Sequence, residues 1–144
     1  MIAAAVLAPV AVFTTSGVAN AAIVGHCAGS NNCSVQEDMG SGVCGASIWQ
    51  TDSAGNTDPS GTFAQAFFGN TTTGYDCRAW IERDVNNTGW YQVSGTYVLP
   101  PTDSSDQTGN YFDGGGYQAR ACIQFDWGSS LGAVHCSPAI GYIG

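Results

Sequence analysis

The sequence predicts an all-β protein, a small antiparallel β-sandwich or flattened barrel, and three observations support that fold class. Apolar and polar residues alternate with a period of two in several segments, which is the pattern of strands that bury one face. Twenty glycines and five prolines supply turns between such segments. No segment shows the helical repeat of apolar positions, so the chain is expected to contain strands and turns only.

Residues 1–21 have the features of a secretion signal. The apolar run 2–13 is twelve residues long, too short for a membrane-spanning helix and typical of a signal-peptide core. Ala19-Asn20-Ala21 matches an A-x-A cleavage site. No basic residue precedes the run, which points to a start codon upstream of Met1. We therefore expect a secreted, extracellular protein whose mature chain begins at Ala22 and forms a single β-rich domain.

Residues 22–42 are expected to form a flexible N-terminal docking arm, because they mix Gly, Ser and Asn with few apolar positions. Ile23 and Val24 are the clearest apolar pair, followed by His26 and a loop between Cys27 and Cys33. A disulfide that closes a loop this short removes only about 2 kcal/mol of chain entropy. It fixes the shape of the loop before binding, which lowers the ordering cost of docking. The alternative role is a terminal clip against proteolysis.

Residues 43–144 are expected to form the β-rich domain. Alternation is clearest around Cys77, Ala79 and Ile81, and again from Tyr117 to Phe125. The turn composition of Asn86-Asn87-Thr88-Gly89 predicts a hairpin, and Pro100-Pro101 must end a strand. Residues 100–116, which include three consecutive glycines, are expected to form one long loop. The predicted strand segments are 43–50, 62–68, 75–84, 89–99, 116–127 and 131–140.

Six cysteines follow the cleavage site, and an even number in an exported chain predicts three disulfides. A zinc site is not expected, because the spacings lack paired C-x2-C units and the chain has only two histidines. The short, turn-prone loop favours the pair Cys27–Cys33. The other four cysteines, Cys44, Cys77, Cys122 and Cys136, retain three possible pairings, of which Cys44–Cys77 with Cys122–Cys136 is the working hypothesis.

Charge and motif content exclude several classes of function. Three Lys+Arg against eleven Asp+Glu give a net charge of -8, which leaves too little positive charge for nucleic-acid binding. No G-x-S-x-G, H-E-x-x-H or P-loop motif is present, and oxidised cysteines offer no thiolate nucleophile. We therefore expect no enzymatic activity, no metal and no cofactor.

The remaining candidates for chemistry have simpler explanations. Glu82 and Asp84 have the residue types of a glycosidase acid pair, but solvated surface acids are the commoner case. His135 lies beside Cys136 and is expected to be structural. Four oxygen-bearing side chains in the segment 100–116 do not match the spacing of a calcium loop, and we expect an ordinary polar loop. These four are Asp103, Asp106, Asn110 and Asp113.

Aromatic residues cluster around the predicted hairpin. Trp80 alternates onto the polar face of its strand with Arg78 and Glu82, while Trp90 and Tyr91 follow the turn. Two interpretations remain open: an exposed aromatic surface that contacts a protein or a sugar ring, or a second buried layer.

The strings Tyr75-Asp-Cys-Arg-Ala-Trp-Ile-Glu-Arg83, Gly116-Tyr-Gln-Ala-Arg-Ala-Cys122 and His135-Cys136 resemble small secreted proteins of Streptomyces and related actinobacteria. With its Cys27–Cys33 loop, the chain resembles the adaptor subunits (UmbB) of umbrella toxin particles. The resemblance implies a non-enzymatic linker in an antibacterial complex, whose arm docks on the repeat-containing ring of a large toxin subunit and whose body holds a lectin subunit. Ile23, Val24, Cys27 and Cys33 would then belong to the ring-facing contact.

Two alternatives come from other classes of protein. Small size, disulfides and export are typical of inhibitors of a protease or a glycosidase, with residues 100–116 as the reactive loop. Trp80, Trp90 and Tyr91 would instead suit a carbohydrate-binding module.

Overall fold

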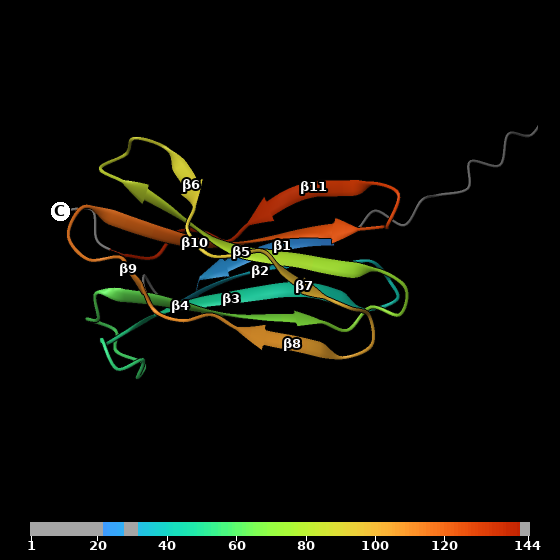
Figure 1. Ribbon diagram of the computed structural model, residues 1–144, viewed down its shortest axis with the longest axis horizontal. Helices are drawn as coiled ribbons and strands as arrows, with labels where there is room; N and C mark the ends of the chain where they lie inside the picture. The colour runs from blue at the N-terminus through green and yellow to red at the C-terminus, as the bar shows by residue number, and fades with distance from the viewer. Residues whose placement is uncertain (1–21, 28–31, 142–144) are drawn as a thin grey trace, which may run out of the picture.

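A computed structural model describes residues 22–27 and 32–141 of the chain, and all regular structure in this part is β-strand (Figure 1). Residues 1–21, to which the secretion signal was assigned, lie outside the described residues, as do residues 28–31 of the disulfide loop. The strands are β1 (Ala22–Cys27), β2 (Asn32–Asp38), β3 (Val43–Thr51), β4 (Phe63–Asn70), β5 (Asp76–Val85), β6 (Trp90–Gln92), β7 (Tyr97–Leu99), β8 (Ser104–Gln107), β9 (Tyr111–Phe112), β10 (Tyr117–Asp126) and β11 (Leu131–Cys136).

The strands form two antiparallel sheets. Sheet A has the order β1-β2-β3-β4-β8, with β9 also paired to β4. Sheet B has the order β11-β10-β5-β6, with β7 also paired to β5. In Figure 1 the two sheets lie one above the other, with β10 and β5 over β3 and β4. The predicted all-β class and sandwich architecture are confirmed.

The core lies between the inward faces of the two sheets. Alternate residues of β3 and β4 are buried, as period-two alternation requires. Phe68 and Phe125 are the largest fully buried side chains. Much of the remaining core consists of small residues, including Ala64, Ala66 and Ala79. Small side chains allow the backbones of the two sheets to approach each other closely, so a modest number of apolar residues fills the space between them.

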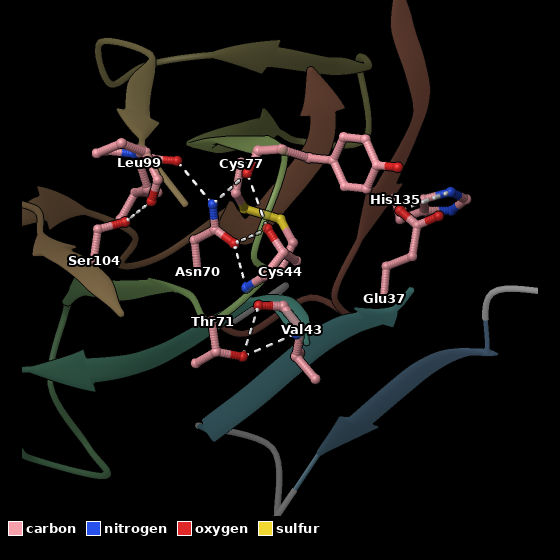
Figure 2. The surroundings of a disulfide bond; sticks show 12 residues. Glu37, Val43, Cys44, Asn70, Thr71, Cys77, Leu99, Ser104 and His135 are labelled. Atoms are coloured by element: carbon pink, nitrogen blue, oxygen red, sulfur yellow. Dashed lines mark hydrogen bonds and ion pairs between the residues drawn. A yellow bond between two sulfur atoms is a disulfide. The ribbon is translucent and has the colours of Figure 1, made fainter. Parts of the chain in front are cut away.

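One disulfide and one buried amide join the two sheets near the start of β3 (Figure 2). Cys44 on β3 is bonded to Cys77 on β5, with the two Cα atoms 5.7 Å apart. The fully buried side chain of Asn70 donates to the carbonyl oxygens of Tyr75 and Leu99 at 2.8 and 2.9 Å. Because both amide donors are used, this buried polar group stabilises the crossing from β4 to β5.

The other two disulfides each link directly opposite residues within one hairpin. Cys27 pairs with Cys33 across β1 and β2, and Cys122 pairs with Cys136 across β10 and β11. Each pair has a Cα–Cα distance of 4.0 Å. All three working pairings are therefore confirmed.

The predicted strands correspond to β3, β4, β5 and β10 within two residues at each end. The predicted hairpin turn is also present: Asn86 and Asn87 have φ of 52° and 57°, and the Thr88 N–H donates to the Val85 carbonyl at 3.1 Å. Successive left-handed residues match the twist of a two-stranded ribbon, which explains the asparagines here. The predicted strand 131–140 is shorter in the structure and ends at Cys136.

One predicted strand and one predicted loop are wrong. The segment 89–99 is not one strand but two short ones, β6 and β7, which pair with different parts of β5. Residues 100–116 are not one long loop, because β8 and β9 both pair with β4. The pairing of β8 and β9 with β4 depends on residues far apart in the chain. Without these two strands, the outer edge of β4 would leave backbone N–H and C=O groups unpaired. The polar composition of residues 104–107 did not indicate that they would pair with β4.

The predicted arm is a hairpin that belongs to sheet A. All seven residues of β2 pair with β3, and Cys33 and Val35 are buried in the core. Only β1 is peripheral. The few apolar positions of this segment fall on alternate residues of β2, so a low apolar content was enough to make a core strand.

Candidate functional site

The outer strand β1 offers the first candidate docking surface. Ile23 and Val24 are 50% and 52% exposed. In the register, Val24 lies opposite Gln36 and His26 lies opposite Ser34. Opposed residues share a face of the sheet, and Ser34 and Gln36 are on the face away from the core. Val24 and His26 therefore present an exposed face, while Ile23 lies on the opposite face at the margin of the core.

The backbone edge of β1 is also available. β1 ends the strand order of sheet A, so among the described residues its outer edge has no strand partner. Such an edge presents a row of free N–H and C=O groups that can add a strand from another protein. The Cys27–Cys33 disulfide holds β1 against β2 at one end, which fixes this edge before any partner arrives.

The outer face beside β1 is hollowed. A shallow depression of about 270 Å³ crosses β2, β3 and β4, and its floor includes Gly45 and Gly69, which are directly opposed in the register. Two facing glycines leave no side chains to fill that part of the sheet surface. Phe67, which is exposed, lines the same depression. The surface from Val24 to Phe67 thus combines exposed apolar side chains with a recess.

The inner side of the β1–β2 hairpin contacts the C-terminal segment. A Cβ placed on Gly25 would lie 3.6 Å from Cδ of Pro138, so the two chains are close at that point. Oε2 of Glu37 on β2 lies 3.8 Å from Nε2 of His135 on β11 (Figure 2). Burial raises the pKa of Glu37, and His135 opposes that shift. His135 is therefore placed as a contact between the sheets, which agrees with the structural role expected for it.

The three residues of the predicted aromatic cluster differ in exposure, with Trp80 buried, Trp90 half-buried and Tyr91 exposed. Trp80 is only 8% exposed, and its Nε1 donates to Oε1 of Glu82 at 3.0 Å. Arg120 donates to Oε2 of the same carboxylate and lies over the ring of Trp90, 4.2 Å from its centroid. Among the three aromatic residues predicted as a binding surface, only Tyr91 is exposed. The interpretation as a second buried layer therefore holds for Trp80, which lies opposite Cys122 of the Cys122–Cys136 disulfide.

A second exposed apolar surface lies on the outer face of sheet B, and sequence reasoning missed it. Val98 opposes Arg78 across β7 and β5, and Val134 opposes Gln124 across β11 and β10. Val98 and Val134 are 52% and 48% exposed. Leu131 is also exposed, and Arg78 pairs with Asp126 at 2.8 Å on the same face. The alternation of β5 shows that Arg78 points outward, but only the strand pairing reveals that Val98 and Val134 share its row.

The candidate catalytic carboxylates have structural partners. Glu82 is held by Trp80 and Arg120, and Asp84 accepts a hydrogen bond from the Gly89 N–H at 3.1 Å. Glu82 also lies near Cys122 and Cys136, but both sulfurs are in a disulfide and cannot ligate a metal ion.

The four oxygen-bearing residues considered for calcium are not brought together as one site. Asp103 and Asp106 are exposed on the β7–β8 turn and on β8, whereas Asp113 is fully buried after β9. Within the described part of the chain, no three acidic, histidine or cysteine side chains come together at this segment. Asn110 accepts from the Thr51 hydroxyl at 3.5 Å and contributes to a turn contact.

The disulfides and the surfaces define a small cross-linked β-sandwich with two exposed apolar faces. Three disulfides indicate an oxidising, extracellular-type environment. In residues 22–27 and 32–141 there is no helix with the length and apolar character needed to cross a membrane. Comparisons with protein-family models, curated proteins and solved structures gave no match.

Proposed function

We propose that this chain is a secreted, non-enzymatic adaptor that joins two other proteins of an antibacterial complex. The observation that carries the proposal is the edge strand β1, with half-exposed Ile23 and Val24, an unpaired backbone edge in the described structure, and a disulfide at its end. The sequence resemblance to umbrella-particle adaptors supports a large repeat-containing toxin subunit as the partner of this edge.

The outer face of sheet B is the surface proposed for the second partner, the lectin subunit. It is separate from β1 because the two belong to different sheets. Its exposed valines lie beside an arginine–aspartate pair, a combination of apolar area and charge that is typical of protein interfaces. Two independent faces are what a linker requires, since both partners must bind at once.

The test uses affinity-tagged protein, recovered in its oxidised form, to capture partners from the secreted proteins of the producing organism, with mass spectrometry as the readout. A double variant Ile23→Asp/Val24→Asp places two charges on β1. We expect it to lose the large repeat protein and to retain the lectin. Val98→Asp/Val134→Asp is the matched variant on sheet B, because these residues are equally exposed. It is expected to lose the lectin and to retain the large subunit.

Each variant serves as the folding control of the other. Recovery of both partners by both variants would contradict the assignment of the surfaces. Recovery of a single protease or glycosidase in place of these partners would favour an inhibitor and overturn the adaptor.

A further inference from the structure

The shallow depression of about 270 Å³ on the outer face of sheet A is a second kind of candidate site. It crosses β2, β3 and β4, which are interior strands of the sheet (Figure 1). Because each of these strands has a neighbour on both sides, their backbone groups are already paired, and the depression cannot receive an added strand. No residue of β1 or of the outer face of sheet B lines it, so its role goes beyond the proposed adaptor function.

The floor of the depression is a pair of glycines, Gly45 on β3 and Gly69 on β4, which are directly opposed in the register. Neither has a positive φ, so the backbone does not require glycine at these positions. The nearest atom to an added Cβ would be the Val35 carbonyl oxygen at 3.6 Å for Gly45, and Cε1 of Phe67 at 3.8 Å for Gly69. Both positions therefore have room for a side chain. Glycine weakens the interior of a strand, and it often marks a place where a ligand approaches the backbone closely.

Side chains of neighbouring positions surround this gap. Gln36 on β2 is opposite Gly45 and closes one side. Ser47 and Phe67 are opposite each other and form the next row along β3 and β4. Residues that are directly opposed, or two apart in one strand, share a face of the sheet, so all three side chains lie on the same face as the gap. Phe67 is 44% exposed and its ring edge reaches toward Gly69, so the gap has an aromatic ring on one side and an amide on the other.

Most of the polar side chains in the depression are free to bond to a ligand. Ser34, Gln36 and Ser47 line it, and none of the three side chains has a hydrogen-bond partner among the described residues. Thr71, in contrast, is already engaged: its hydroxyl oxygen accepts from the Val43 N–H at 2.9 Å (Figure 2). The depression therefore offers two hydroxyls and one amide that can both donate and accept hydrogen bonds.

These groups favour one chemical class of ligand. None of the lining residues is charged, so a phosphate, a carboxylate or an ammonium group would lose its solvation without finding an opposite charge. A purely apolar ligand, such as a lipid chain, would cover the serines and the glutamine without replacing their bonds to water. A neutral sugar has hydroxyls that donate and accept around its edge, and an apolar ring face that packs against an aromatic side chain. It therefore matches Phe67 and the polar side chains at the same time.

We propose that this depression binds one residue of a neutral oligosaccharide, which lies over Gly45 and Gly69, packs against Phe67 and exchanges hydrogen bonds with Gln36 and Ser47. The volume is slightly below the roughly 300–1,000 Å³ of sites for drug-sized molecules, which suits a single sugar ring. The site lies on the opposite sheet from the aromatic cluster for which the sequence predicted sugar binding.

The experiment is an NMR titration of the ¹⁵N-labelled, oxidised protein with cellohexaose, chitohexaose, mannohexaose and maltohexaose, and with glycerol as a polyol that has no ring. We expect at least one oligosaccharide to cause saturable shifts of the Gly45 and Gly69 amides, and glycerol to cause none. Phe67→Ala should weaken that binding about tenfold, because it removes the aromatic surface. Phe112→Ala is the matched control, since Phe112 is 42% exposed and lies outside the depression.

Gly45→Thr tests the site without removing an aromatic ring. Threonine is a good strand former and its Cβ would make only ordinary contacts at this position, so the sheet is expected to stay folded. The added side chain fills the floor of the depression and should abolish binding. Gly95→Thr is its control, because a Cβ there meets no atom within 4 Å and Gly95 lies outside the depression.

Binding that survives Gly45→Thr, or that Phe67→Ala and Phe112→Ala weaken equally, would overturn the proposal. So would silence with all four oligosaccharides, or shifts of the same size with glycerol. Loss of binding in Tyr91→Ala with Phe67→Ala unaffected would place the sugar on sheet B and would also overturn it. The titration needs no partner protein, so its failure is distinct from a failure of the capture experiment that tests the adaptor.

Discussion

Two buried or largely buried carboxylates lie near opposite ends of strand β3, and their surroundings differ. Glu37 is opposite Cys44 at the start of the strand and has His135 as an ion partner 3.8 Å away. Asp113 is fully buried at the other end, where the charge of Arg83 and the side chain of Gln50 oppose the effect of burial on its pKa. Burial raises the pKa of both groups. The comparison distinguishes a partly exposed carboxylate that lies beside a histidine of the other sheet from a fully buried one whose pKa burial raises to about 6.

The largest loss of stability is expected when the disulfide that joins the two sheets at the start of β3 is removed. The Cys44→Ala/Cys77→Ala variant should lose about 4 kcal/mol of unfolding free energy, because a disulfide with a sequence separation of 33 restricts the unfolded chain strongly. Urea unfolding followed by tryptophan fluorescence measures the loss.

Cys27→Ala/Cys33→Ala is the matched control, with a separation of only 6 and an expected loss of about 2 kcal/mol. Equal losses in the two variants would show that the bond between the sheets has no special role at this end of β3.

An intermediate effect is expected at Asp113. Because its folded pKa is raised from 3.8 to about 6, the native state holds a proton that the unfolded state releases, and stability falls as pH rises through that interval. Asp113→Asn has no such loss. Between pH 4 and pH 8 the stability of the variant relative to wild type should therefore grow by about 2 kcal/mol.

Urea unfolding at the two pH values measures this difference, with Asp106→Asn as a control whose relative stability stays constant. A variant that becomes relatively less stable toward pH 8 would mean that the ionised carboxylate has a stabilising partner, and the contrast with Glu37 would disappear.

The smallest effect is expected at Glu37. Its pKa is raised in the folded state, so the sign is the same: stability falls as pH rises above 4.5. The carboxylate is partly reached by solvent and His135 opposes the shift, so between pH 4 and pH 8 Glu37→Gln should gain less stability relative to wild type than Asp113→Asn does. The same urea series measures it. A gain as large as that of Asp113→Asn would show that the two carboxylates are equally removed from water.

Local patterns predicted the central strands well. In β5, Cys77, Ala79 and Ile81 alternate with Arg78, Trp80 and Glu82, and the first three are fully buried. The short Cys27–Cys33 loop and the asparagine turn at 86–89 were likewise predictable, because each depends on residues close together in the chain.

The candidate sites were less predictable. Asp113 gave no local sign of burial, since its surroundings include Gln50 and Gly61 from another part of the chain. Trp80 was assigned to a polar face, but it is buried and lies opposite Cys122 on the neighbouring strand β10. The exposed row that includes Val98 and Val134 depends on two separate strand pairings.

By itself, the sequence determined that this chain is a β-protein with three cross-links, because side-chain alternation, turn residues and cysteine number act over a few residues at a time. The tertiary structure decided which strand edges stay free, which tryptophan is buried and which carboxylate is taken out of water. Those outcomes depend on contacts between segments far apart in the chain, such as β4 with β8 and the turn 58–62 with residue 113. Period-two alternation contains no information about which strands meet.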